Sequence, residues 1–198
     1  MNDRNIDDAT AATSTDQSRF PLAGGAPWLN LIATVGRAYS AAPIERLATT
    51  ADLDEWLVAN GLQAPPSNDR DLSVAYDLRA ACRTISEAIV SATTPPSAAI
   101  RTIASDARHV SFTAYPQGAR WDTARDALGS VALTALLSLT GPERAMLAQC
   151  HDPECGWVFL DPSGRRHWCP SRSCGTRTRV RQHRARSKIE PTAASGTQ

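Results

Sequence analysis

The sequence lacks long apolar runs and shows no sign of a secretory signal. Its first residues have neither the basic start nor the apolar stretch of a signal peptide. The longest apolar candidate, Val131 to Leu139, is too short to cross a bilayer and is interrupted by Thr134 and Ser138. We therefore expect a cytoplasmic protein without membrane contact, in a compartment where disulfides are uncommon.

Recognisable catalytic motifs are absent as well. The sequence contains no nucleophile elbow, no glycine-rich phosphate loop, no His–Glu metal motif and no internal repeat. Carboxylates and histidines that are scattered along a chain can still converge in space, but no pattern in this sequence groups them. We therefore expect that the protein is not an enzyme.

Charge is balanced overall but unevenly distributed. The 198 residues carry a formal net charge of +1, and 42% of them are hydrophobic, which suits one moderate domain and a small module. Residues 1–149 hold 12 basic and 16 acidic residues, whereas residues 150–198 hold 9 and 4. A mildly acidic body with a basic end indicates a polyanionic partner for that end.

Four of the five cysteines lie in the basic end, as two Cys-x4-Cys pairs. Structural zinc sites are usually built from two such short pairs separated by a longer loop. We therefore expect one structural zinc ion. Its predicted ligands are Cys150, Cys155, Cys169 and Cys174. The alternatives are disulfides, four ordinary buried cysteines, or the replacement of one ligand by His151 or His167.

The loop between the two pairs has the pattern of a hairpin. Trp157 to Leu160 is a short strand signal, and Asp161 to Gly164 has the residues of a type I turn. Arg165 to Trp168 is the expected returning strand. This hairpin is predicted to carry the second cysteine pair back to the first.

An arginine-rich segment follows the last cysteine. On a helix, Arg177, Arg181, Arg184 and Lys188 form one stripe, and Thr176 is typical of an N-cap. Arginines in a first turn are unfavourable with the helix dipole, and few residues of this helix are apolar. Both features indicate that the helix binds a polyanion, which would neutralise its charge. A solvated tail is the alternative. The predicted nucleic-acid contacts are Arg165, Arg166, Arg172, Arg177, Arg179, Arg181 and Arg184.

The cysteine-rich stretch resembles the CGNR zinc finger. The matching residues are Cys150, Cys155, Phe159, Asp161, Arg165, Arg166, Trp168, Cys169, Cys174, Gly175 and Arg177. Thr176 departs from the motif, which has Asn there. The resemblance implies that an α-helical ABATE domain precedes the finger, as in bacterial stress-induced transcription regulators. The upstream match is looser and rests on Trp28–Leu31, Glu45–Leu47 with Asp52–Leu53, and Trp56–Leu57.

The body is predicted to be mainly helical. Helices are expected at Pro27–Ser40, Ala51–Asn60, Asp69–Ala92, Ser97 to about Ala107, and Thr123–Thr140. A hairpin is expected from His109–Tyr115 through a turn at 116–118 to Arg120–Trp121. Cys82 falls on the apolar stripe of the longest helix and is expected to be a small buried residue.

These elements define the predicted fold class and domains. The fold is mainly α, with a helical N-terminal domain that contains a small β-hairpin and a C-terminal zinc module of a hairpin followed by a basic helix. Residues 20–147 form the helical domain and 148–189 the finger. The flanks, 1–19 and 190–198, are expected to be disordered. Almost no linker separates the two domains, so the finger should dock on the body.

The leading functional hypothesis is a transcription regulator that binds DNA through the finger. The helical domain is expected to sense a small-molecule effector or to mediate homodimerisation. One alternative is a zinc–thiolate redox switch or protein-interaction adaptor without nucleic-acid binding. Another is RNA binding, with Trp157, Phe159 and Trp168 stacking on bases.

Overall fold

The computed structural model describes residues 19–116 and 118–189. The two flanks that were predicted to be disordered lie outside these ranges, apart from residue 19. The elements in chain order are α1 (Pro27–Ile32), β1 (Val35–Gly36), β2 (Ile44–Glu45), α2 (Thr50–Ala59), α3 (Asp69–Val90), α4 (Ser97–Asp106), β3 (Phe112–Tyr115), β4 (Gly118–Trp121), α5 (Ala124–Thr140), the 3-10 helix η1 (Pro142–Met146), β5 (Leu147–Gln149), β6 (Val158–Leu160) and α6 (Arg172–Ile189).

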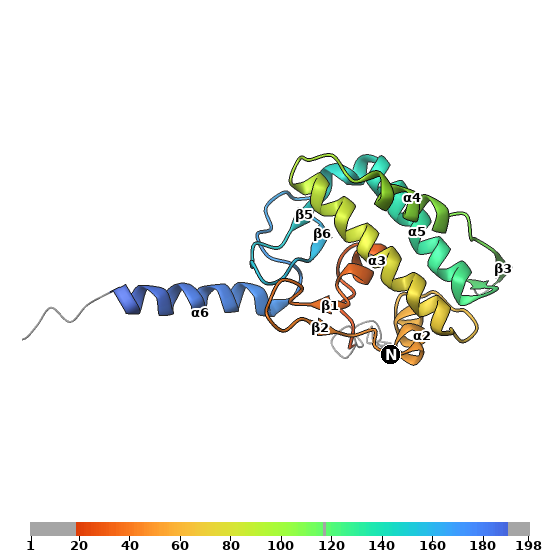
Figure 1. Ribbon diagram of the computed structural model, residues 1–198, viewed down its shortest axis with the longest axis horizontal. Helices are drawn as coiled ribbons and strands as arrows, with labels where there is room; N and C mark the ends of the chain where they lie inside the picture. The colour runs from red at the N-terminus through yellow and green to blue at the C-terminus, as the bar shows by residue number, and fades with distance from the viewer. Residues whose placement is uncertain (1–18, 117, 190–198) are drawn as a thin grey trace, which may run out of the picture.

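Helix α3 is the centre of the helical body. It contacts α1, α2, α4 and α5, and Figure 1 shows α3, α4 and α5 lying side by side. The three strand pairs, β1–β2, β3–β4 and β5–β6, are each antiparallel. Trp28, Trp56, Leu78 and Leu128 are fully buried between the helices. The mainly α fold is therefore confirmed.

Local capping signals fix most of the helix boundaries. The side chain of Asn68 accepts hydrogen bonds from the backbone N–H groups of Arg70 and Asp71, and the Asn68 N–H in turn donates to the Asp71 carboxylate. Such a capping box satisfies backbone donors that the first helical turn leaves free. Thr123 caps α5 in a similar way, through the Asp126 N–H. The predicted helices of residues 51–140 and the β3–β4 hairpin are confirmed with small changes at their ends.

The first helix is shorter than predicted, and the extension to Ser40 was wrong. Arg37 has a φ of 51°, in the left-handed region, which a continuing right-handed helix does not allow. Beyond it, the Ala38 N–H donates to the Cys155 carbonyl and the Tyr39 N–H to the Glu154 carbonyl. The backbone that the sequence assigned to helix is thus paired with the distant finger.

The hydrophobic core continues from the body into the finger. Val158 and Phe159 are fully buried, and Trp157 is nearly so. The Trp157 Nε1–H donates to the Leu29 carbonyl at the end of α1 at 3.1 Å. Arg83 on α3 donates to the Gly156 carbonyl at 2.8 Å. These contacts bear out the expected docking of the finger.

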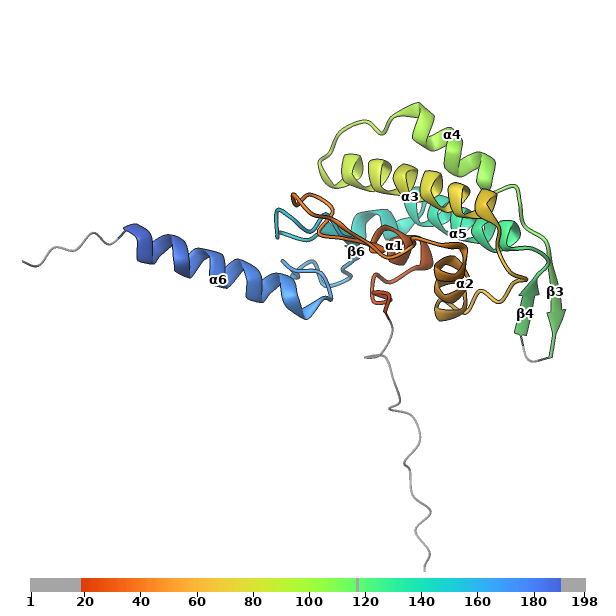
Figure 2. The same cartoon turned by 60° about the horizontal axis from the view of Figure 1, so that its bottom comes forward.

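Helix α6 leaves this core and extends away from the body. Figures 1 and 2 show it as a single rod at the end of the molecule opposite the β3–β4 hairpin. Among the helices of the described residues, none is long and apolar enough to traverse a bilayer.

Candidate metal centre and cationic helix

The four cysteines that were predicted to be zinc ligands come together in one buried cluster. Their sulfur atoms all lie within 4.8 Å of one another. The Cys155 and Cys169 sulfurs are 3.8 Å apart, and those of Cys169 and Cys174 are 3.4 Å apart. None of the cysteines is in a disulfide.

This donor set fits one tetrahedral zinc ion. A Zn–S bond of about 2.3 Å places sulfurs at the corners of a tetrahedron about 3.8 Å apart, close to the observed separations. Four thiolates complete the coordination shell, so the ion is structural. The Cys82 thiol lies apart from the cluster and is fully buried, and its burial raises its pKa well above the usual range, as expected for a small core residue.

The chain reaches the first cysteine pair through a hairpin that the sequence analysis misplaced. Strand β6 pairs with β5, with Ala148 opposite Phe159, rather than with residues 165–168. Residues 165–168 form no strand, because the Asp161 carboxylate turns the chain by accepting from the backbone N–H groups of Ser163 and Arg166. The predicted returning strand was therefore wrong.

Two of the three histidines of the finger, His151 and His167, lie close in sequence to zinc ligands and contact each other. The His151 and His167 rings pack edge-to-face with centroids 4.9 Å apart, and the His151 N–H donates to the His167 carbonyl at 2.9 Å. This backbone bond joins the two cysteine-bearing loops.

Helix α6 begins before the last cysteine. It starts at Arg172, so that Cys174 lies in its first turn, and the Ser171 hydroxyl accepts from the Ser173 N–H. The prediction that Thr176 starts the helix was therefore wrong. Gly175 lets the first turn of α6 pack closely against Trp168, because a Cβ there would lie 3.2 Å from the ring.

Asp152 is the central acidic residue of the finger, and it lies between the first two cysteines. Its side chain is fully buried and forms ion pairs with Arg177 and Arg181, each at 2.9 Å. Burial alone raises the pKa of Asp152, but the hydrogen bonds from Arg181 and Arg177 outweigh it, so the pKa falls below its ordinary value. Asp152 thereby fixes the base of α6 against the first cysteine loop.

Arg177 also reaches the metal site. Its Nη2 lies 3.1 Å from the Cys174 sulfur. A guanidinium at this distance stabilises the thiolate form that binds zinc. Arg177 therefore joins Asp152 to the sulfur cluster.

Glu154 extends the ion-pair network to the body. It pairs with Arg181 of α6 at 3.1 Å and with Arg37, which follows β1, at 3.0 Å. Acidic residues between two zinc ligands are the sequence signal for these contacts, and sequence reasoning missed them. The direction of α6 is consequently tied to both the finger and the body.

The seven arginines predicted to contact nucleic acid divide into different environments. Arg177 and Arg181 are paired at the base of α6, as described. The Arg166 guanidinium lies over the Phe159 ring at 5.1 Å, and Arg179 donates to the Gly175 carbonyl at 3.2 Å. Arg165 and Arg184 are exposed, and the Arg172 side chain lies outside the described part of the chain. Arg186, which the prediction omitted, is exposed on α6 as well.

Comparisons with known families match both parts of the chain. The ABATE model, described as "Putative stress-induced transcription regulator", matches residues 25–142, and the CGNR zinc finger model matches residues 146–187. No curated protein matches the chain.

Proposed function

The chain belongs to the ABATE family and ends in a CGNR zinc finger, and from this premise we propose that it is a cytoplasmic transcription regulator that binds DNA through α6. The helical body is its regulatory part, which senses a ligand or mediates dimerisation. The zinc ion folds the finger and is not itself catalytic, because four thiolates leave it no open position for water. The proposal includes no enzymatic activity.

The observation that carries this proposal is the isolation of a cationic helix. Helix α6 has seven basic residues and no acidic one, and it extends away from the body (Figure 2). Asp152 and Glu154 pair with the base of the helix, but the cations beyond Arg181 repel one another, and phosphates relieve that repulsion.

The spacing of the outer arginines fits phosphate contacts on both sides of the major groove of DNA. Arg184 and Arg186 are two residues apart, so they point to nearly opposite sides of the helix, while Arg179 and Arg186 share one side. The major groove of DNA admits an α-helix and has a phosphate backbone along each wall. We assign the phosphate contacts to Arg179, Arg184 and Arg186, with Arg165 and Arg166 beside the helix base.

Arg177 and Arg181 serve this proposal differently from the other arginines. Their guanidinium groups are held by Asp152 and Glu154, so they fix the helix in place before any DNA arrives. A preorganised helix loses less conformational freedom on binding.

The RNA alternative loses support because two of its three rings are buried. Trp157 is 5% exposed and Phe159 0%, so neither ring is available to stack on a base, whereas Trp168 is half-buried. The redox alternative keeps one favourable observation, the contact between Arg177 and the Cys174 sulfur, because a nearby cation favours the thiolate, which is the reactive form of a cysteine.

The decisive experiment titrates zinc-replete protein against random duplex DNA at two salt concentrations and measures metal content on the same sample. Contact with about five phosphates gives a slope of log K against log salt of roughly −4 to −5. The regulator proposal would be refuted if the DNA affinity did not depend on salt concentration. It would also be refuted if protein with one zinc per chain did not bind DNA at low salt. Either result would favour the adaptor or redox switch.

A further inference from the structure

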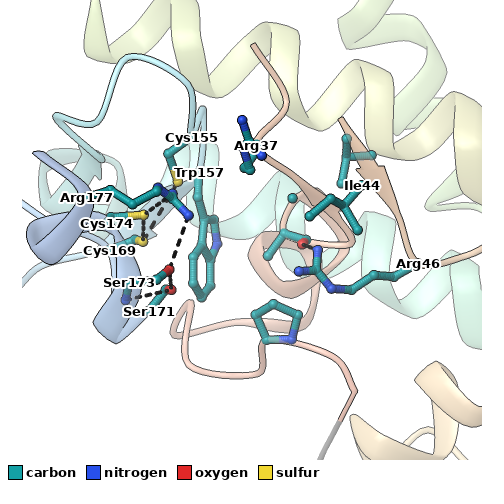
Figure 3. A pocket seen from close by; sticks show the side chains of 14 residues that line it. Arg37, Ile44, Arg46, Cys155, Trp157, Cys169, Ser171, Ser173, Cys174 and Arg177 are labelled. Atoms are coloured by element: carbon teal, nitrogen blue, oxygen red, sulfur yellow. Dashed lines mark hydrogen bonds between the residues drawn. The ribbon is translucent and has the colours of Figure 1, made fainter. Parts of the chain in front are cut away.

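A cavity of about 90 Å³ lies where the body meets the base of α6. Fourteen residues line it, and they come from the β1–β2 segment, from the finger and from Pro21 (Figure 3). The lining includes Arg46, Trp157, Ser171 and three of the four zinc ligands. The cavity therefore touches both the predicted regulatory body and the start of the cationic helix.

Charges of both signs line the cavity. Three arginines face it together with three zinc-binding thiolates, and no aspartate or glutamate does. Two of the arginines are paired: Arg37 with Glu154, and Arg177 with Asp152 and with the Cys174 sulfur. Among the described residues, the third arginine, Arg46, forms no such pair.

Within the described residues the guanidinium of Arg46 has no carboxylate partner, and only the backbone N–H of Arg46 donates to the Glu45 carboxylate, at 3.0 Å. The Arg46 Nη1 donates to the Ala33 carbonyl at 3.4 Å, a long contact. The neighbouring Glu45 is engaged elsewhere, because both of its carboxylate oxygens accept from Arg79, at 2.8 and 2.6 Å. The guanidinium of Arg46 therefore has donors to spare.

The position of Arg46 is built into the backbone. A Cβ at Gly36 would lie 2.5 Å from its Nη1, so a larger residue at position 36 would displace the guanidinium from this place. Burial is the main cause that lowers the pKa of Arg46, and the charge of Glu45 offsets only part of this effect while Arg19 adds to it, so the cation lacks a full counter-charge. An anion in the cavity would supply that charge.

The rest of the lining is apolar and small. Val35, Ile44 and the Trp157 ring form walls close to Arg46, and Figure 3 shows this ring between Arg46 and the sulfur cluster. The hydroxyls of Ser171 and Ser173 offer further polar contacts at the helix start. The volume is far below that of a nucleotide site.

We propose that this cavity binds a small carboxylate with a short aliphatic or single-ring body. Arg46 holds the carboxylate, and the apolar walls cover the body of the ligand. The effect of such a ligand on α6 rests on the proposed function, because it requires that α6 binds DNA. If so, linkage demands that DNA changes the carboxylate affinity by the same factor as the carboxylate changes the DNA affinity.

The test is calorimetric titration of the zinc-replete full chain with benzoate, with benzyl alcohol as the neutral analogue and sulfate as an anion without an apolar body. We expect benzoate to bind with a Kd on the order of 1 mM or tighter, and both controls to bind at least about tenfold more weakly. Arg46→Met and Gly36→Ala should each weaken benzoate about tenfold or more. Arg108→Met, which removes an exposed arginine of the body, should leave it unchanged.

Equal binding of benzoate and benzyl alcohol, or benzoate binding that survives both cavity variants, overturns the proposal, as does the absence of benzoate binding. Duplex DNA titrated on the same samples separates the two proposals. Benzoate binding without DNA binding supports the cavity and refutes the regulator. DNA binding without benzoate binding refutes the cavity alone.

Discussion

Asp152 combines full burial with two ion pairs, and this makes it the most sensitive charged residue of the finger. Asp152→Asn keeps the shape of the side chain but removes its charge, while Arg177 and Arg181 stay in place. We expect the variant to lose about 1–3 kcal/mol of unfolding free energy, the scale of hydrogen bonds to charged groups. Urea unfolding of zinc-replete protein at neutral pH measures the loss.

The matched control is Asp77→Asn, an exposed aspartate on α3. It should change the unfolding free energy by less than about 0.5 kcal/mol. Equal effects of the two substitutions would show that the Asp152 network adds nothing to the stability of the finger.

The lowered pKa of Asp52 leads to a prediction of how the unfolding free energy depends on pH. The hydrogen bond from Arg19 is the main cause that lowers its pKa to about 2, and the capping bonds of α2 add to it. Because the folded pKa lies below the unfolded value, the stabilisation is fully present above about pH 4 and is lost as the pH falls toward 2. Asp52→Asn should therefore cost roughly 1 kcal/mol at pH 6, the scale of a lost helix cap.

Urea midpoints of the two proteins, compared at each pH, measure this difference. It should shrink between about pH 4 and pH 2. Protonation of the thiolates releases zinc from both proteins alike, so the comparison isolates Asp52. A difference that stays constant through this range would contradict the assigned pairing with Arg19.

Among the elements of the described residues, α6 is the helix that extends away from the body (Figure 2). Arg184→Ala combined with Arg186→Ala removes two cations from it and touches neither Asp152 nor the zinc site. DNA affinity should fall at least about tenfold at low salt, and the salt slope should become shallower by about 2. Fluorescence anisotropy with a labelled random duplex at several salt concentrations measures both quantities.

The control for this pair is Arg101→Ala combined with Arg108→Ala, which removes the same charge from exposed positions in and just after α4. It should leave both the affinity and the slope nearly unchanged. If the two double variants weaken binding equally, the DNA contact reflects net charge rather than α6.

The elements that the sequence predicted well are those with local causes. Asn68 and Thr123 cap α3 and α5 from within a few residues, so their boundaries could be read directly. The zinc ligands were equally predictable, because paired cysteines report the metal by spacing alone. Their clustering confirms the zinc site.

The elements that could not be predicted from the sequence depend on partners that are distant along the chain. Helix α1 ends early because the backbone after Arg37 pairs with the finger more than 100 residues away. Strand β6 prefers β5 because the Asp161 turn directs the following residues elsewhere. The arginine stripe on α6 was predicted. The carboxylates that hold its base, those of Asp152 and Glu154, lie on another loop, so the periodicity of the helix does not reveal them.

At the scale of the whole molecule, the body and the finger share one core. Trp157, Val158 and Phe159 are buried in the same cluster as the body residues Trp28 and Leu29. Zinc binding contributes on the order of 10 kcal/mol in small modules that do not fold without metal. In this chain, that free energy should support the body as well as the finger.

We therefore expect a single cooperative transition when the zinc-replete protein is heated. Helix content by circular dichroism and zinc release to a chromogenic chelator should share one midpoint, and prior removal of zinc should lower the melting temperature of the helical body. The shared core is the reason, since loss of the finger exposes Trp28 and the end of α1 to water. Zinc release well below the melting of α1–α5, with the helices unaffected, would show instead that the two domains are energetically independent.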